Sequence, residues 1–194
     1  MEPRLIKKLN KGFTLVETLV SIALFGIISL ILINVFIVSI KTQTRILQGQ
    51  ELVEQSSYAL EYMGSKMRMA IKDETGSCIG LSNVGKSYGL GTNSIIFLSP
   101  DSANIDNYLC RQFFLDSNSI KERVSADTSV PGGSGNIITS PSFNADNLTF
   151  YVKGDESNLQ PRVTISIVMH KEDQGDNISK MIVQTTISKR QIDI

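Results

Sequence analysis

The chain has 194 residues, of which 19 are basic and 19 acidic, so its formal net charge is zero. This length accommodates one ordinary domain and a long anchor, and the balanced charge gives no global field that would attract nucleic acid or an anionic membrane. Tryptophan is absent and His170 is the single histidine, which disfavours catalytic sites that depend on imidazole or on zinc, since no second imidazole is available.

A basic leader precedes a long apolar segment. Residues 1–12 contain four basic residues and one acidic residue, and without them 15 basic and 18 acidic residues remain. From Phe13 to Ile40 run 28 residues whose only charge is Glu17. About 20 helical residues cross a bilayer core, so this apolar segment is long enough to span one. The basic leader predicts a cytoplasmic N-terminus and a C-terminal domain outside.

Two simpler interpretations of the apolar segment explain less. A secretory signal peptide has an apolar region of roughly 7–15 residues followed by a small-x-small cleavage site, and neither property fits here. A plain single-pass anchor fits the length but leaves Glu17 unexplained. A carboxylate within a membrane span costs up to about 2.5–3.5 kcal/mol at the bilayer centre and less near the interface, and it usually marks function.

The residues Lys11-Gly12-Phe13-Thr14-Leu15-Val16-Glu17 resemble the class III signal of type IV prepilins and type II secretion pseudopilins. That signal combines a short basic leader, a glycine, a phenylalanine or methionine, and a glutamate four residues further on, all before an apolar helix. The resemblance implies that a prepilin peptidase cuts between Gly12 and Phe13 and methylates the new N-terminus at Phe13. It also implies that Glu17 neutralises the Phe13 ammonium of a neighbouring subunit in a filament.

The resemblance implies partners and a location as well. The partners are the prepilin peptidase and methyltransferase, other pilins or pseudopilins, a membrane assembly platform, and lipid before assembly. The expected location is the cytoplasmic membrane and then a cell-surface or periplasmic filament, which serves pilus biogenesis, DNA uptake or protein secretion. Major pilins often carry a proline where this chain has Asn34, so we expect an unbroken helix and favour a minor subunit.

Beyond Ile40 the helix is predicted to continue as an amphipathic segment over 41–75. Apolar residues recur at helical spacing, which predicts a stripe that packs on a globular core. The stripe consists of Ile46, Val53, Leu60, Met63, Met67 and Ala70. We place the end of the helix near Thr75-Gly76, because glycine can supply a left-handed cap.

Residues 76–194 are predicted to form a β-rich globular head. Strands are expected at Ser94–Leu98, Tyr108–Leu115, Ile120–Val124, Leu148–Val152, Arg162–His170 and Lys180–Ser188. The predicted fold class is therefore α+β, with a long N-terminal helical spine packed on one meandering antiparallel sheet. The pilin family has the same layout.

The predicted head offers few chemical sites. Cys78 and Cys110 can close one disulfide in an exported domain, or can be two small buried hydrophobes. Asp173, Asp176 and Asn177 offer oxygen ligands for calcium in a tight turn, but they lack EF-hand spacing and a solvated turn is the commoner explanation. The glycine-rich segment 130–136 has no Lys-Ser/Thr to hold phosphates. His170 is predicted to be a surface residue of a strand and not part of a catalytic triad. We expect no cofactor.

Three functions compete at this point. The first is a structural, non-enzymatic filament subunit, and the second is a single-pass membrane protein with an extracytoplasmic ligand-binding or sensing domain. The third, an anchored enzyme, lacks convergent catalytic motifs. Direct nucleic-acid binding is not expected either, because the basic residues of the head are scattered among acids without aromatic interleaving.

Overall fold

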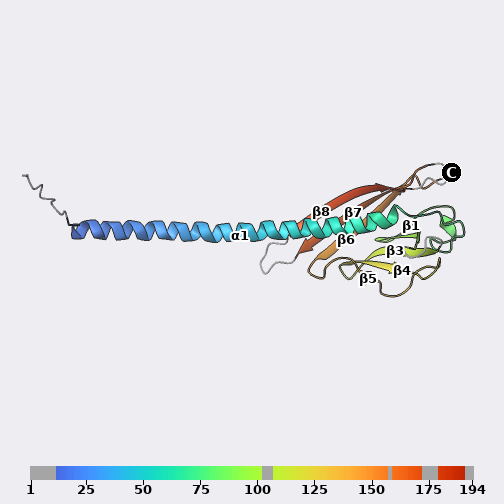
Figure 1. Ribbon diagram of the computed structural model, residues 1–194, viewed down its shortest axis with the longest axis horizontal. Coiled ribbons are helices and arrows are strands. Elements are labelled where there is room, and N and C mark those ends of the chain that lie inside the picture. The colour runs from blue at the N-terminus through green and yellow to red at the C-terminus, as the bar shows by residue number, and fades with distance from the viewer. Residues whose placement is uncertain (1–11, 102–106, 157–158, 172–178, 191–194) are drawn as a thin grey trace, which may run out of the picture. The chain divides into compact units, whose positions relative to one another are not determined.

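The computed structural model describes residues 12–101, 107–156, 159–171 and 179–190. The N-terminal element is the helix α1, Leu15–Met67, which continues through Asn34 without interruption (Figure 1). The chain divides into a first unit, Met1–Ile46, and a second unit, Leu47–Ile194. The first unit consists, where it is described, of the N-terminal part of α1 and the residues just before it.

The second unit contains two antiparallel sheets. The five-stranded sheet has the order β1-β2-β3-β4-β5, and the three-stranded sheet has the order β6-β7-β8 (Figure 1). A 3₁₀ turn, η1 (Leu81–Asn83), precedes the first strand. The strands are β1 Gly89–Gly91, β2 Ser94–Pro100, β3 Tyr108–Asp116, β4 Ser119–Val124, β5 Asn136–Ile137, β6 Asn144–Lys153, β7 Arg162–Lys171 and β8 Ser179–Ser188.

The predicted α+β class, with a long helix and antiparallel strands, is confirmed, and the predicted single sheet is wrong. All six predicted strands occur, but β6, β7 and β8 form a sheet of their own. The turn from β3 to β4 explains why that hairpin was visible in the sequence. Ser117 and Asn118 both have positive φ, of 51° and 58°, which is the backbone of a tight two-residue hairpin turn.

One core joins the helix to both sheets. Buried side chains from α1, from β2 to β4 and from β6 to β8 form a single cluster, in which Met63, Phe97, Phe113, Ile165 and Met169 are almost fully buried. Phe97 and Phe113 lie with their ring centroids 5.7 Å apart in a tilted arrangement. The part of α1 within the second unit is therefore held by burial against the sheets.

The predicted apolar stripe of the helix is only half right. Leu60, Met63 and Met67 are buried as expected, and so is Ala70 just beyond the helix, but Ile46 and Val53 are about half exposed. The helix instead buries small residues that a hydrophobicity pattern overlooks. The buried residues of α1 are Leu52, Ser56, Ala59, Leu60, Met63, Gly64 and Met67. Serine, alanine and glycine let the sheets approach the helix axis closely, which changes the buried face.

The helix also ends earlier than predicted, at Met67 and not near Thr75-Gly76. Ala70 N–H donates to the Met67 carbonyl at 3.1 Å, three residues back, so the last turn tightens. Ile71 then forms an antiparallel bridge with Leu98 of β2, and its N–H donates to the Leu98 carbonyl at 3.0 Å. Pairing with the sheet edge therefore replaces the helical hydrogen bonds at this point.

Candidate processing and assembly segment

The helix starts just after the predicted cleavage site. Gly12, Phe13 and Thr14 precede α1, and Thr14 caps it: the Glu17 N–H donates to Thr14 Oγ1 at 3.3 Å, and the Thr18 N–H donates to the Thr14 carbonyl at 3.2 Å. The peptide bond between Gly12 and Phe13 therefore lies outside the helix. A peptidase needs an extended backbone, and the cap keeps this bond in a non-helical stretch.

Most polar side chains within the apolar segment (Phe13–Ile40) form local hydrogen bonds with the helix backbone. The hydroxyls of Thr18, Ser21 and Ser29 donate to backbone carbonyls three or four residues earlier, at 2.7–2.8 Å, and Asn34 Nδ2 donates to the Leu30 carbonyl at 3.1 Å. Such bonds shield polar groups from an apolar surrounding. They are available to a hydroxyl or an amide because both carry a proton to donate.

Glu17 forms no such bond. A carboxylate without a proton can only accept hydrogen bonds, and the Glu17 side chain has no hydrogen bond or ion pair with another described residue. The structure does supply a local reason for an acidic residue, which the sequence analysis missed: Glu17 lies in the first turn, where the helix dipole favours a negative charge. Among the described residues, no cation pairs with this carboxylate.

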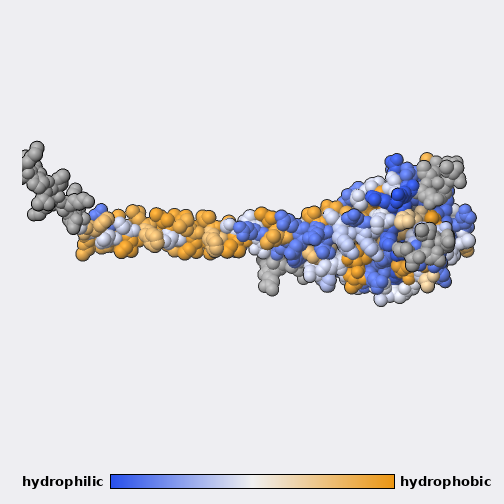
Figure 2. Space-filling view, viewed as in Figure 1, coloured by the Kyte–Doolittle hydropathy of each residue, from blue (hydrophilic) through white to orange (hydrophobic). Residues whose placement is uncertain are grey.

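The surface around Glu17 is mainly apolar. From residue 12 to 47 every residue is exposed except Ser29, which is half-buried, and the space-filling view shows this stretch as mainly hydrophobic (Figure 2). By length and composition α1 is a helix that could cross a membrane, and it is the one such helix in the described ranges. A bare apolar cylinder of this size is covered in a cell by lipid or by other chains.

Comparison with known families identifies this same stretch. The family model described as the prokaryotic N-terminal methylation motif matches residues 7–33. The motif is the class III signal peptide of type IV pilins, and it supports a type IV pilin-like protein that is processed at its N-terminus. Together with the apolar N-terminal helix it fits a membrane-anchored pilin. It implies a prepilin peptidase and other pilins as partners. No curated protein and no solved structure gives a significant match.

The two cysteines of the second unit form a disulfide. Cys78 and Cys110 are joined across 32 residues of sequence, with their Cα atoms 5.6 Å apart, and both are almost fully buried. The bond ties the loop that follows α1 to strand β3. Of the two alternatives open from the sequence, the structure therefore has the bridged one.

Asp73 organises the same loop. Its Oδ1 accepts hydrogen bonds from the Gly76 N–H at 2.8 Å and from the Thr75 hydroxyl at 3.0 Å, and its Oδ2 accepts from the N–H groups of Cys78 and Ile79 at 2.9 and 3.1 Å. Burial raises the pKa of the Asp73 carboxyl, but these hydrogen bonds together lower it below its ordinary value. The ionised carboxylate thus fixes the loop by accepting hydrogen bonds from several of its residues.

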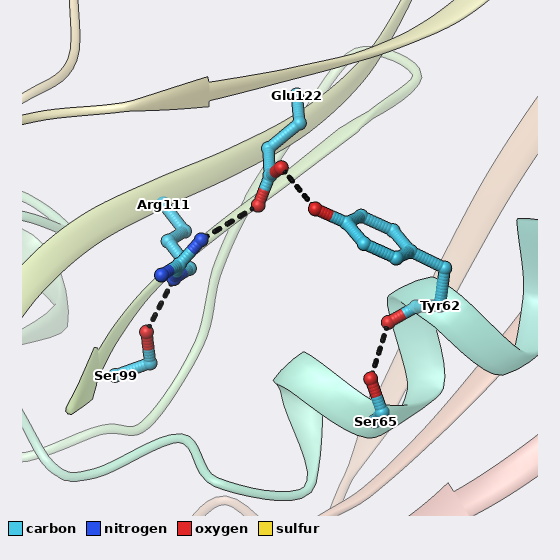
Figure 3. Close-up of polar contacts among 5 residues, drawn as sticks. All are labelled: Tyr62, Ser65, Ser99, Arg111 and Glu122. Carbon is cyan, nitrogen blue, oxygen red and sulfur yellow. Dashed lines mark hydrogen bonds and ion pairs between the residues drawn. The ribbon is translucent and has the colours of Figure 1, made fainter. Parts of the chain in front are cut away.

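A polar cluster inside the second unit was not predicted. Glu122 on β4 accepts from Arg111 Nη1 of β3 at 2.9 Å and from the Tyr62 hydroxyl of α1 at 2.6 Å, while Arg111 Nε donates to Ser99 Oγ at 2.8 Å (Figure 3). Burial, together with the bond to Glu122, raises the pKa of Tyr62 to about 12. The cluster joins the helix to the five-stranded sheet, and its buried charges are paired with each other.

His170 is not the surface residue that the sequence indicated. Its ring lies partly buried, with Nδ1 2.7 Å from Asp146 Oδ1, and Lys180 Nζ lies 3.2 Å from Asp146 Oδ2. Burial raises the pKa of Asp146, but the hydrogen bond from Lys180 and the nearby His170 ring outweigh it and lower that pKa. The arrangement joins β6, β7 and β8 and offers no triad.

The remaining candidates carry little chemistry. Asp173, Asp176 and Asn177, the calcium candidates, lie outside the described residues, and the described residues hold no group of three metal-ligating side chains. The glycine-rich segment 130–136 leads into the short strand β5. Among the basic residues of the second unit, Lys121 contacts Asp116 at 2.6 Å and Arg123 lies over the Phe114 ring at 4.0 Å, so these two charges have local partners.

Proposed function

We propose that the chain is a structural, non-enzymatic subunit of a type IV pilus-like filament, and a minor pilin or pseudopilin rather than the main building block. The observation that carries this proposal is the single carboxylate, that of Glu17, in the exposed apolar segment Phe13–Ile40, where Thr18 and Ser21 form local hydrogen bonds. The unbroken helix at Asn34, where major pilins often have proline, supports the minor role.

Processing follows from the helix start. Gly12 lies before the helix cap, and a Cβ added to it would meet no atom within 4 Å, so the need for glycine arises from the close approach of the peptidase and not from the fold. Cleavage after Gly12 removes the basic leader and exposes the amine of Phe13. Methylation of that amine keeps its positive charge.

Assembly then places unlike charges together. Once the apolar helices pack side by side, an isolated carboxylate or ammonium is costly, while a pair of them is tolerable. The Glu17 carboxylate of one subunit accepts from the Phe13 ammonium of the next. Because only one axial offset brings the two groups together, this pair fixes the register between subunits.

The orientation of the chain is part of the proposal. The basic leader stays in the cytoplasm, the apolar segment crosses the membrane once, and the second unit lies outside. The Cys78–Cys110 disulfide supports an oxidising compartment for that unit. The assembled location is a filament at the cell surface or in the periplasm.

Intact-mass measurement tests the processing step. Protein extracted from the native membrane should lack residues 1–12 and carry one methyl group on Phe13. A mass that still includes Met1 would contradict the proposal. It would favour instead a single-pass membrane protein with an extracytoplasmic ligand-binding domain, which needs no cleavage at Gly12.

Glu17→Ala tests the assembly step. We expect this variant to be cleaved normally and to be lost from filaments, with a decrease of at least tenfold in the filament fraction, because the Phe13 ammonium then lacks its partner. Glu54→Ala, which removes an exposed carboxylate from the same helix outside the apolar segment, is the matched control and should assemble normally. Quantitative immunoblotting of sheared filaments against membranes gives the result, and normal incorporation of Glu17→Ala would exclude the pairing role.

A further inference from the structure

Asn34 carries the one side-chain amide of the apolar segment (Phe13–Ile40). The side chain is exposed, and its Nδ2 donates to the Leu30 carbonyl of the same helix at 3.1 Å. An amide has two N–H donors and a carbonyl oxygen that accepts. One N–H and the oxygen Oδ1 of Asn34 therefore have no partner within the described part of the chain.

This amide lies in the part of α1 that the proposed function puts inside the bilayer. Residue 34 is about 11 Å along the helix from the middle of the apolar segment, and the hydrocarbon core extends about 15 Å on each side of its midplane. In hydrocarbon there is no water to bond an unpaired N–H or C=O group. Side-chain amides there form hydrogen bonds across helices, which add to the packing that holds membrane helices together. The free half of the Asn34 amide is thus a specific reason for contact with another helix.

We propose that Asn34 pairs with Asn34 of a second copy of this chain while both copies are in the membrane. All copies insert with the same end on the same side, so their helices are parallel and the two amides lie at the same depth. The remaining N–H of each amide can then donate to Oδ1 of the other. The pairing rests on the membrane anchoring and the orientation of the proposed function, and it needs neither cleavage nor filament assembly.

The helix face around Asn34 is compatible with a two-helix contact. Steps of three and four residues from Asn34 give the positions that face a parallel partner helix. These positions hold exposed side chains, namely Val20, Ala23, Ile27, Leu30, Ile37 and Lys41. Two-stranded parallel coiled coils favour β-branched residues seven apart, as at Val20 and Ile27, and a single asparagine in that row fixes their register. Because the segment is apolar on all sides, the amide and not hydrophobicity selects this face. Lys41 follows the end of the segment, where its ammonium can reach water.

The choice of a second copy as the partner rests on depth and on the donor and acceptor count. A different membrane helix would need both a donor and an acceptor at the level of residue 34, and a second copy has both there because the chains are identical. The contact also differs from the one in the filament. The Glu17–Phe13 pair requires an axial offset of four residues, about 6 Å, whereas the Asn34 pair requires none. Two chains cannot form both contacts at once, so the Asn34 pair belongs to subunits held in the membrane before assembly.

Disulfide cross-linking in membranes of cells that produce the full-length protein tests the pairing. Both native cysteines are already joined in the disulfide, so an introduced cysteine is the one free thiol. Under mild oxidation Ile27→Cys, seven residues before Asn34 on the same face, should give a covalent homodimer. Leu32→Cys is the matched control, because Leu32 is similarly exposed in the same segment and lies on the opposite side of the helix. It should cross-link at least tenfold less.

The role of the amide is tested by adding a second substitution to Ile27→Cys. Asn34→Leu should reduce the dimer at least fivefold, because the apolar side chain leaves no hydrogen bond between the helices. Ser29→Ala is the control, since the Ser29 hydroxyl donates to the Phe25 carbonyl of its own helix, and it should leave the dimer unchanged. Each variant must be present in the membrane in the native amount.

Three results would each overturn the pairing. They are equal cross-linking of Ile27→Cys and Leu32→Cys, a dimer that Asn34→Leu does not reduce, and a cross-link to a different protein in place of the homodimer. The intact-mass test of N-terminal cleavage is independent of these outcomes, so a failure of the pairing and a failure of the filament proposal can be told apart.

Discussion

Substitution of Gly12 can show whether glycine is required at this position by the peptidase or by the fold. We expect Gly12→Ala to reduce cleavage by at least tenfold, because a methyl group at this position meets only the peptidase and no atom of the chain within 4 Å. Gly26→Ala is the matched control: its added methyl also meets nothing, it lies inside the helix, and it should be cleaved at the normal rate. Pulse-chase labelling followed by electrophoresis measures both rates. Equal cleavage of the two variants would contradict the role of Gly12.

Asp73 makes the stability of the protein depend on acid pH. Its folded pKa lies below the ordinary value of about 3.9, so the stabilisation is fully present above that pH and is lost as the pH falls through the folded pKa. Asp73→Asn should lower the free energy of unfolding by roughly 1–3 kcal/mol at neutral pH, because buried N–H groups lose a charged acceptor. The difference from the native chain should shrink as the pH falls below that ordinary value and through the folded pKa.

Urea unfolding followed by circular dichroism at several pH values measures this effect. Asp116→Asn is a suitable control, since its carboxylate is exposed and pairs with Lys121 at the surface, where an ion pair contributes little to stability. If the two variants lose the same stability at neutral pH, the loop around Asp73 does not depend on its carboxylate.

Sequence patterns pointed to the residues of the proposed processing segment and missed those of the polar cluster. Gly12, Phe13 and Glu17 stand out because one charge in a long apolar run is conspicuous. Arg111 and Glu122 gave a weaker signal. Each occupies a buried position of its strand, where an apolar side chain is expected, and the two residues carry opposite charges. Only the β3–β4 register brings them together, and that register depends on the whole sheet.

At the scale of elements, the disulfide holds the segment after α1 against the five-stranded sheet. Replacing both cysteines by alanine should lower the free energy of unfolding by about 3–4 kcal/mol, because the bond closes a loop of 32 residues in the unfolded chain. The double variant avoids a free buried thiol. Comparison of urea midpoints for the oxidised native chain, the reduced native chain and the variant measures the effect. Unchanged midpoints would mean that the bond does not constrain this loop.

The elements that could be predicted from the sequence are those in which apolar and polar residues alternate with a clear local period. β7 alternates buried and half-exposed residues along its length, so it was visible, whereas β1 and β5 are too short to show a pattern. The end of α1 was misplaced because its cause is tertiary: Ile71 pairs with Leu98, which no local propensity encodes. The division into two sheets has the same origin, since the strand patterns do not say which strands are neighbours.

At the scale of the whole molecule, the first and second units differ in where their apolar side chains go. Every buried apolar residue of the described chain lies at or after Leu52, whereas the apolar side chains of the first unit are exposed. The second unit therefore has its own core, and the first unit needs lipid or neighbouring chains. This difference predicts that the two units can be separated.

A fragment that starts at Leu47 should fold without detergent. Its core and its disulfide are complete, and the removed residues contribute no buried apolar side chain among those described. We expect a soluble protein with the circular dichroism of a mixed helix and sheet, a cooperative thermal transition and no thiol that reacts before reduction. The full chain should need detergent under the same conditions. A fragment that aggregates or reacts with thiol reagents while folded would show that residues 1–46 help to form the core, and that the anchor is more than a membrane and filament segment.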